Sequence, residues 1–326
     1  MSSLSTPNDA ASGRRRRSVD PAIVTAYGCI LALLLIGSMY SPNFLSWPYL
    51  LQQLKVASFL GVVATGTMFV ILLGQIDLSL PWVLTTGAMM ASAAAAHQGI
   101  VGILAVPLGL LCGATIGLVN GFAVAYMRVP SMIVTMATNA VAQGLMIAYT
   151  GGFSPRDTAS PFMRALATGS IIPDVANGVL VWGLVAILAL FMLRRTTFGR
   201  ALYAIGNRER AAYMSGIATR WTTLWVFVIA GVLSALGGVL LAGYSAKASQ
   251  AMGDAYLMPA IAAVVLGGTN VMGGKGSYLG TVAGVILVTL LQSILSVMQI
   301  EEAGRQLIYG AVIIVMLLLY GRQRLL

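Results

Sequence analysis

The sequence contains very little charge. Only 9% of its 326 residues are charged and only 9 residues are acidic, whereas 58% are hydrophobic. In ordinary soluble domains roughly a quarter of the residues are charged, and too much of the chain lies at the surface to hide so many apolar side chains. The composition therefore excludes an ordinary soluble domain and indicates a chain that is embedded in lipid.

Cysteine, histidine and paired carboxylates are also scarce. The two cysteines, Cys29 and Cys112, lie inside apolar runs, and His97 is the single histidine. A structural disulfide and a cysteine-based zinc site are therefore not expected. No His-Glu-x-x-His, Gly-x-Ser-x-Gly or Walker A motif is present, and Asp77 lacks the second intramembrane acid that an aspartyl protease needs. We expect a non-catalytic chain without a metal site.

Long apolar runs make up most of the chain, and each is bounded by polar residues, glycine or proline. Each run predicts a helix, because a helix satisfies its own backbone hydrogen bonds in lipid. The predicted fold class is all-α, a polytopic membrane bundle of about ten transmembrane helices. Two runs, 82–97 and 257–272, are short for a span, which favours tilted or re-entrant helices. The full set is 21–40, 51–74, 82–97, 100–127, 130–149, 178–194, 221–244, 257–272, 276–299 and 304–320.

The N-terminal segment requires a choice between a signal sequence and a retained helix. Arginines at 14–17 precede the first apolar run, as they do in signal peptides and twin-arginine export signals. The run is close to the length that spans a bilayer, and no small-residue cleavage site follows it. We therefore predict a retained first helix. Residues 1–20 are expected to form a disordered, basic cytoplasmic tail, and residues 21–322 a single transmembrane domain.

Basic residues are distributed unevenly between the runs. If the N-terminus is inside, 14 of the 19 Lys and Arg residues face the cytoplasm, as the positive-inside rule requires. Both termini are therefore expected in the cytoplasm of a bacterial inner membrane protein. The net charge of +10 then reflects topology and lipid contact, not nucleic-acid binding. The 14 residues are Arg14, Arg15, Arg16, Arg17, Arg128, Arg194, Arg195, Arg200, Arg208, Arg210, Arg220, Lys275, Arg322 and Arg324.

Two further patterns concern the packing and symmetry of the predicted bundle. Gly113, Gly117 and Gly121 stand four residues apart, a spacing that lets two helix backbones approach closely. The stretches 70–83 and 264–277 share a design, in which an apolar run enters a glycine-containing polar break before the next span. An internal duplication and a chance similarity both remain open.

Asp77 is the isolated carboxylate of the apolar part of the chain. A carboxylate at the bilayer centre costs about 2.5–3.5 kcal/mol. Asp77 avoids this cost if it lies near the inner interface and caps the helix expected to begin near Pro81. The alternative interpretation is that Asp77, with Gln75 beside it, belongs to a translocation path or gate.

Amide side chains are the other polar groups within the runs. Buried amides most often tie helices together through hydrogen bonds. Asn139 and Gln143 lie four residues apart on one helical face, and amides also suit a polar path for a neutral hydroxylated solute, because they both donate and accept. Asn120 and Gln292 are further examples of helix-tying candidates. The candidates for a path or gate are Gln75, Asp77, Asn139, Gln143 and Asn270.

The longest inner loop, at about 195–220, is amphipathic and interrupted by glycine. Asn207 is expected to cap the N-terminus of a short helix over 208–215, and Gly216 to end that helix. A helix that lies across the membrane plane in this way can occupy a groove on a partner protein. The alternative is an ordinary basic inner loop that binds nothing.

Three segments of the chain resemble the permease subunits of bacterial ABC sugar importers of the ribose, xylose, arabinose and galactose type. Residues 197–217 are similar to the family's Phe-Gly-Arg-x-x-Tyr-Ala-Ile-Gly segment and its continuation to Ser-Gly-Ile. Residues 68–79 resemble the Phe-Val-Ile-Leu-x-Gly-Gly-Ile-Asp-Leu-Ser motif, and residues 263–281 resemble the late glycine-rich motif. The similarity extends over about 44–319, with the segments in family order.

This resemblance implies the membrane-spanning half of an importer, working as a homodimer. A periplasmic binding protein would deliver a sugar or polyol, and a two-domain cytoplasmic ATPase would bind the inner loop. The chain itself would bind no cofactor, since ATP and Mg²⁺ belong to the ATPase. The residues implied in ATPase coupling are Gly199, Arg200, Tyr203, Gly206, Asn207, Ala211, Ala212 and Gly216.

The chain also departs from the family pattern. Gln75 stands where a second glycine is usual, and Leu80-Pro81-Trp82 replaces the usual Val-Gly-Ser. Glycine permits tighter packing or a strained turn, which these residues do not. We expect the family's fold to be kept, whereas the substrate can differ from that of typical members. A carrier or channel that works without ATP is the alternative function, although it leaves the inner loop without a purpose.

Overall fold

The computed structural model describes residues 21–40, 42–97, 99–153, 155, 157–301, 303–311 and 314. Within these residues all regular secondary structure is helical, and no β-strand occurs. The all-α prediction is confirmed. The expectations for residues 1–20 and for the end of the last run lie outside the described residues.

Six helices are long and apolar enough to cross a membrane by length and composition. Each coincides with one predicted run, with ends shifted by a few residues. They are α2 (Trp47–Leu72), α5 (Ala105–Ala125), α6 (Ser131–Thr150), α8 (Asn177–Arg195), α11 (Thr219–Ser245) and α13 (Tyr278–Val297).

The remaining helices are shorter or belong to the connections. The apolar helices α3 (Leu80–Ala95) and α12 (Asp254–Leu266) have 16 and 13 residues, as their short runs predicted. A span needs about 20 residues, so each is shorter than a full crossing. The first run forms α1 (Pro21–Tyr40), and residues 303–311 are helical. The others are η1 (Pro42–Leu45), α4 (Ile100–Ile103), α7 (Pro161–Thr168), α9 (Thr197–Asn207) and α10 (Glu209–Met214).

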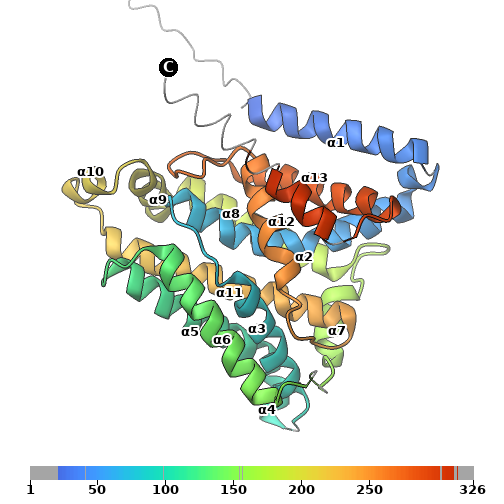
Figure 1. Ribbon diagram of the computed structural model, residues 1–326, viewed down its shortest axis with the longest axis horizontal. Helices are drawn as coiled ribbons and strands as arrows, with labels where there is room; N and C mark the ends of the chain where they lie inside the picture. The colour runs from blue at the N-terminus through green and yellow to red at the C-terminus, as the bar shows by residue number, and fades with distance from the viewer. Residues whose placement is uncertain are drawn as a thin grey trace, which may run out of the picture.

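Helices α2 and α11 form the centre of the bundle (Figure 1), and α11 packs against α5, α3 and α2. The glycine row of α5 explains the close fit. A Cβ on Gly113 would overlap the carbonyl oxygen of Gly231 in α11, and one on Gly117 would overlap that of Phe227. The row is therefore a helix–helix contact face, as its spacing predicted. On the other side of α2, α13 packs against α1, α12 and α2.

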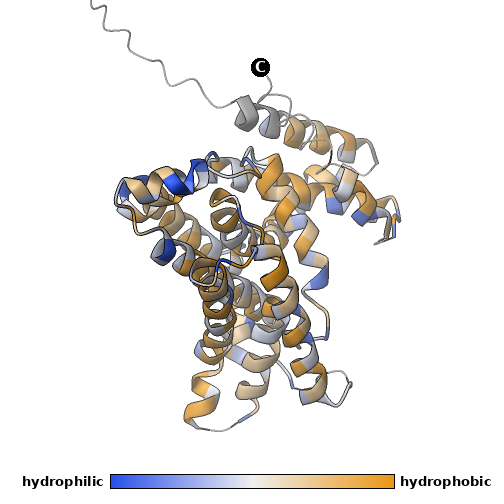
Figure 2. Cartoon of the chain, turned by 60° about the vertical axis from the view of Figure 1, so that its left-hand side comes forward, coloured by the Kyte–Doolittle hydropathy of each residue, from blue (hydrophilic) through white to orange (hydrophobic). Residues whose placement is uncertain are grey.

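One end of the bundle carries α9 and α10, at the upper left of Figure 1. We call it the α9 end. The C-terminal ends of α2 and α5 lie there, because Gly206 of α9 contacts Leu72 and Gly121 contacts Leu224 near the start of α11. Basic residues gather at this end, at Arg128, Arg194, Arg195, Arg200, Arg208, Arg210, Arg220 and Lys275. Figure 2 shows the same end as the most hydrophilic part of the described chain, above helices that are mainly apolar.

Candidate functional site

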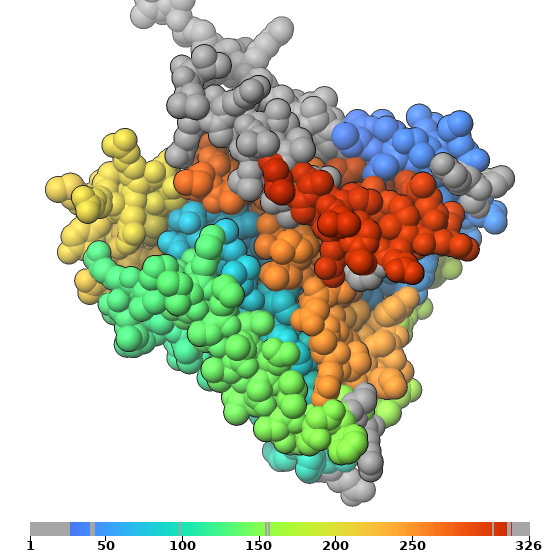
Figure 3. Space-filling model, in the orientation of Figure 1, coloured from blue at the N-terminus to red at the C-terminus, as the bar shows by residue number. Residues whose placement is uncertain are grey.

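The chain between α2 and α3 is not helical, although it lies within the bundle. Helix α2 ends at Leu72 and α3 begins at Leu80, which leaves residues 73–79 as a linker. Gly74 has φ +75°, a conformation that glycine adopts without strain. This turn ends the helix, and the linker runs from the α9 end into the bundle (Figure 1). In the space-filling view a light blue surface separates green α5 and α6 from orange α12 (Figure 3).

Side chains of helix α6 accept hydrogen bonds from backbone N–H groups of the non-helical linker and of the start of α3. The Ile76 N–H donates to Ser131 Oγ at 3.3 Å, and the Leu78 N–H donates to Thr135 Oγ1 at 3.0 Å. The Trp82 N–H, at the start of α3, donates to Asn139 Oδ1 at 3.3 Å. The three acceptors are four residues apart and therefore lie on one face of α6. Unpaired backbone groups are costly in lipid, so this face fixes the path of the linker.

A chain of polar side chains crosses from the linker to α5 and α6. Asp77 is buried, and its Oδ1 accepts hydrogen bonds from the Ser79 N–H at 2.8 Å and the Ser79 hydroxyl at 2.6 Å. Asn120 Nδ2 donates to Ser79 Oγ at 2.8 Å, and the Thr138 hydroxyl donates to Asn120 Oδ1 at 2.7 Å. We call Asp77, Ser79, Asn120 and Thr138 the polar chain. Asn120 ties helices together, as expected for a buried amide.

Asp77 supports the start of α3 without capping it directly. The N-cap residue of α3 is Ser79, whose side chain makes no capping hydrogen bond. Asp77 instead binds both the N–H and the hydroxyl of this N-cap residue. The carboxylate therefore orients the first residue of the helix start, and the expectation of a simple cap is corrected in this respect.

The start of α12 meets the start of α3 inside the bundle. The Gly253 N–H, just before α12, donates to Thr85 Oγ1 at 3.1 Å. A Cβ on Gly253 would overlap the carbonyl oxygen of Pro81, so no larger residue fits without movement. Both Gly253 and Thr85 are buried. Two short helices thus begin next to each other within the bundle, an arrangement that many transporters use near their substrate site.

At the α9 end, α9 touches the end of α2 and the glycine-rich loop at 267–277. The Gly274 N–H donates to the Leu72 carbonyl oxygen at 2.9 Å. A Cβ on Gly206 would overlap that same oxygen, and one on Gly274 would lie 2.6 Å from Asn207 Oδ1. We call Leu72, Tyr203, Gly206, Asn207 and Gly274 the α9 junction. It joins the two stretches that share a sequence design, because Leu72 and Gly274 belong to one stretch each.

Tyr203 fastens the α9 junction through its hydroxyl, which donates to the Gly276 carbonyl oxygen at 3.0 Å. Burial raises the pKa of the Tyr203 phenol above its usual value. The hydroxyl therefore stays protonated and able to donate over the whole physiological pH range.

The inner segment contains two helices where one was expected. Asn207 is the last residue of α9, and Arg208 is the N-cap residue of α10 with an extended backbone of φ −158°. The prediction that Asn207 caps a helix over 208–215 was wrong, because α9 continues through Asn207 into its contact with Gly274. The expected end at Gly216 is confirmed. Gly216 has φ +80°, and the Ile217 N–H donates back to the Ala212 carbonyl oxygen at 3.1 Å.

The coupling candidates of this segment divide between two faces. Gly199 and Ala212 are buried and Tyr203 and Gly206 are half-buried, so these residues pack toward the bundle. The exposed residues are Arg200, Asn207, Ala211 and Gly216.

Sequence reasoning missed two large apolar side chains on α10, Tyr213 and Met214. Their exposed fractions are 68% and 88%. They lie on α10 close to the exposed Arg208 and Arg210, and an exposed apolar group among polar neighbours often marks a contact surface. The sequence gave no indication that these two side chains are exposed, because they do not continue the helical periodicity of the rest of the segment.

The candidates for a path or gate fall into separate places. Asp77 and Asn139 both hold the linker region, Gln75 is half-buried within the linker, and Gln143 is exposed one turn beyond Asn139. Asn270 lies apart from them in the glycine-rich loop, where its Oδ1 accepts the Met272 N–H at 3.0 Å. The hydroxyls of Ser131, Thr135 and Thr138 were missed, although the four-residue spacing of Ser131, Thr135 and Asn139 is visible in the sequence.

Comparison of the sequence with known proteins shows that the chain is similar to one family of transport proteins. The model of the permease component of branched-chain amino acid transport systems matches residues 49–317. The ribose import permease protein RbsC of Haemophilus influenzae is 34% identical over 296 residues, which cover 89% of this chain and 90% of the relative. No solved structure matches the chain significantly.

Two further relatives give the same result. The ribose import permease protein RbsC of Escherichia coli K12 is 32% identical over 304 residues, which cover 90% of this chain and 92% of the relative. The L-arabinose ABC transporter permease protein AraH of Azospirillum brasilense is 28% identical over 324 residues, with 96% and 92% covered. Since the match covers nearly the whole length of chain and relatives alike, the chain belongs to the family of ABC-importer permease components and is a multi-pass protein of the bacterial inner membrane.

Proposed function

We propose that the chain passes a monosaccharide or related polyol across the inner membrane. The observation that carries this proposal is the meeting of α3, α12 and the linker inside the bundle, beside the hydroxyl and amide groups of α6. Neutral groups that donate and accept hydrogen bonds suit a hydroxylated solute. The names of the relatives, ribose and L-arabinose permeases, favour a sugar, whereas the description of the family model names branched-chain amino acids.

A separate cytoplasmic ATPase of two domains would supply the energy, and ATP and Mg²⁺ would be bound there. The sequence has no Walker A motif. Support for the docking position comes from the exposed face of the α9–α10 segment, where Arg200, Ala211, Tyr213 and Met214 are open to contact. Exposed apolar side chains beside cations are typical of the centre and rim of a protein interface.

The α9 junction gives the ATPase a direct route to the linker. When the ATPase moves α9, Gly206 pushes on the Leu72 carbonyl, since almost no space separates them. Leu72 is followed at once by the linker, whose first residues bond back to α2. Its second half, from Ile76 to Ser79, donates its backbone hydrogen bonds to side chains of α6 and of Asp77. The linker is therefore the element that changes position between the inward-open and outward-open states.

The distribution of cations supports an α9 end that faces the cytoplasm. Ten crossings follow if α1 and the helix at 303–311 span the bilayer alongside the six long helices, and if α3 and α12 each complete a crossing together with the non-helical residues that precede them. Both termini would then lie in the cytoplasm.

The functional unit would be a homodimer whose copies face each other along α6. This helix is one of the two least buried of the six long helices, and it exposes the Gln143 amide. An amide that faces lipid is costly, so a second copy and a polar path between the copies would give Gln143 its partners. A periplasmic sugar-binding protein would deliver the solute to the opposite end from α9.

Reconstitution tests the proposal. Proteoliposomes would contain the permease, its cognate ATPase and its binding protein, and uptake of radiolabelled D-ribose, L-arabinose and L-leucine would be compared with and without ATP. We expect ATP-dependent uptake of a sugar and none of leucine. Leucine uptake alone would contradict the substrate class, and uptake by the permease without ATP would favour the carrier alternative. Cross-linking of a Met214→Cys variant to the ATPase tests the docking position separately.

A further inference from the structure

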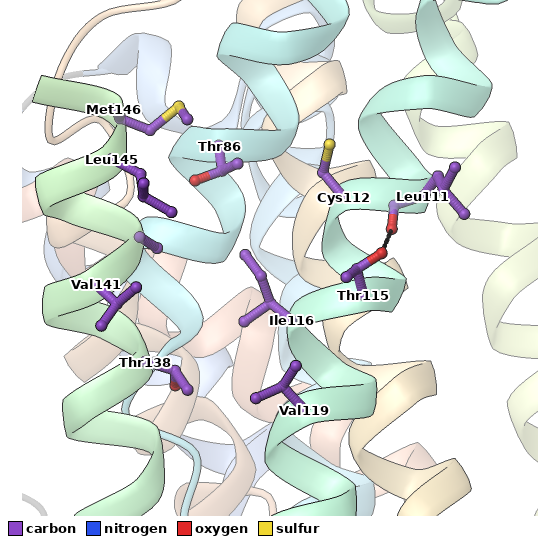
Figure 4. Close-up of a pocket in the computed structure, with 11 residues that line it drawn as sticks. Thr86, Leu111, Cys112, Thr115, Ile116, Val119, Thr138, Val141, Leu145 and Met146 are labelled. Atoms are coloured by element: carbon purple, nitrogen blue, oxygen red, sulfur yellow. Dashed lines mark hydrogen bonds between the residues drawn. The ribbon is translucent and has the colours of Figure 1, made fainter. Parts of the chain in front are cut away.

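A cavity of about 480 Å³ lies between α5 and α6 with α3 behind it (Figure 4). Its walls are almost wholly carbon. In Figure 4 Val141 and Leu145 of α6 face Ile116 and Val119 of α5 across the gap. The residues that line it are Thr86, Leu111, Cys112, Thr115, Ile116, Val119, Thr138, Val141, Ala142, Leu145 and Met146.

The polar atoms of the wall do not call for a polar occupant. The Thr115 hydroxyl donates to the Leu111 carbonyl oxygen of its own helix, and the Thr138 hydroxyl donates to Asn120. Thr86 Oγ1 has no hydrogen-bond partner among the described residues, but the atom is itself buried and gives the cavity no polar surface. An apolar space holds no ordered water. Because α5 and α6 are among the less buried of the long helices, a lipid chain or a protein side chain can reach this space from the membrane.

The turn between α5 and α6 adds a positive charge at one end of the cavity. Arg128 lies in this turn and is exposed. Thr138, at the near end of the cavity, lies seven residues after Ser131, the first residue of α6, a rise of about 10 Å. Phe122 and Tyr126 stack at 5.3 Å near the same turn, and both are partly exposed. Exposed aromatic rings at helix ends are typical of the interface between membrane and water.

We propose that the cavity between α5 and α6 binds one acyl chain of an anionic phospholipid whose phosphate lies at Arg128. The complementarity is one of both shape and charge. A phosphate bound by the Arg128 guanidinium leaves the acyl chain directed along the two helices into the apolar space. The occupied cavity keeps α6 at its distance from α5 while α6 continues to hold the linker.

Native mass spectrometry in mild detergent tests this proposal. Purified permease is mixed with a few molar equivalents of phosphatidylglycerol or phosphatidylcholine, and the retained lipid is counted. We expect phosphatidylglycerol to be retained preferentially, and Arg128→Gln to weaken its retention about fivefold, the effect of one lost Arg near a membrane surface. Equal retention of the two lipids, or an unchanged Arg128→Gln variant, overturns the headgroup assignment.

A matched pair of variants tests the acyl-chain position. Leu145→Trp places a ring in the cavity, whereas Leu184→Trp places a ring of the same size on α8 outside it, and the two native leucines are similarly exposed at 61% and 59%. Leu145→Trp should lower lipid retention about tenfold and Leu184→Trp should leave it unchanged. Equal effects of the two variants overturn the proposal, and folding is checked by the elution volume of both.

The two cysteines give an independent readout on the native chain. Cys112 lines the cavity, and Cys29 is exposed on α1 away from it. Substoichiometric phosphatidylglycerol in detergent should slow alkylation of Cys112 by N-ethylmaleimide and leave Cys29 unchanged. Protection that depends on protein concentration and not on lipid would show that a second copy fills the cavity, which overturns the proposal.

Discussion

Gly206 of α9 lies so close to Leu72, the last residue of α2, that a side chain on Gly206 would overlap the Leu72 carbonyl oxygen. That oxygen also accepts the hydrogen bond from Gly274 at 2.9 Å. Three segments that are far apart in the sequence therefore share one atom as their meeting point. A displacement of α9 toward α2 has to move the end of α2 as well, because the packed contact leaves no free space to absorb it.

Gly206→Val should uncouple ATP hydrolysis from uptake while the protein still inserts into the membrane. The added side chain forces α9 away from Leu72, and such overpacking costs about 1–3 kcal/mol. The measurement is uptake per ATP hydrolysed in proteoliposomes. Gly183→Val is the matched control, because Gly183 also lies within a helix and a Cβ there meets nothing within 4 Å. Unchanged uptake in Gly206→Val would show that the junction does not transmit the motion.

Asp77→Leu should lower both thermal stability and uptake more than Asp77→Asn does. Asparagine keeps an oxygen that can accept the Ser79 hydrogen bonds, whereas leucine leaves the buried Ser79 donors unpaired. Hydrogen bonds to a charged group contribute about 1.5–3 kcal/mol each. Because Asp77→Asn keeps the accepting oxygen and removes only the charge, the stability that this variant loses measures the contribution of the charge. The thermal midpoint in detergent and sugar uptake are measured side by side. If Asp77→Asn behaves as wild type, Asp77 acts only through its geometry at the start of α3.

Asn120 and Thr138 should be energetically coupled. Asn120→Ala removes the bridge between Ser79 and Thr138, and Thr138→Val removes the donor to Asn120 Oδ1. In a double-mutant cycle on unfolding free energy we expect a coupling of about 0.5–3 kcal/mol, the range for groups in one network. Thr115→Val is the control, because the Thr115 hydroxyl binds only its own helix. Additive effects would mean that the polar chain is not one unit.

Much of this architecture could be predicted from the sequence. The apolar runs predicted the long helices, and the short runs at 82–97 and 257–272 predicted the two short helices α3 and α12. The lone carboxylate at Asp77 and the glycine row of α5 were recognised because each is unusual for its surroundings. These features depend on local composition, which a sequence displays directly.

The contacts between segments could not be predicted in the same way. Nothing in the sequence indicates that Gly253 meets Pro81, or that Leu72 is shared by Gly206 and Gly274, because these contacts depend on how the helices pack. The end of α9 was misplaced for the same reason. Asn207 has the residue type of an N-cap, but its tertiary contact with Gly274 lets α9 continue through it.

Tyr203→Phe should weaken the α9 junction and change its response to alkaline pH. The variant loses the hydrogen bond to the Gly276 carbonyl oxygen, with a cost of about 0.5–1.5 kcal/mol. Because burial raises the pKa of Tyr203 in the folded protein, the folded state retains its proton longer than the unfolded state, and this residue's contribution to stability is lost as pH rises above about 10.

The thermal midpoint of wild type should therefore fall more steeply than that of Tyr203→Phe when pH is raised from about 8 to about 10.5. Tyr213→Phe is the matched control, since Tyr213 is 68% exposed on the neighbouring α10. It should follow the wild-type curve throughout. Parallel curves for wild type and Tyr203→Phe would mean that the phenol is not held in its buried, hydrogen-bonded position, and that the contact between α9 and the glycine-rich loop depends on Gly206 and Gly274 alone.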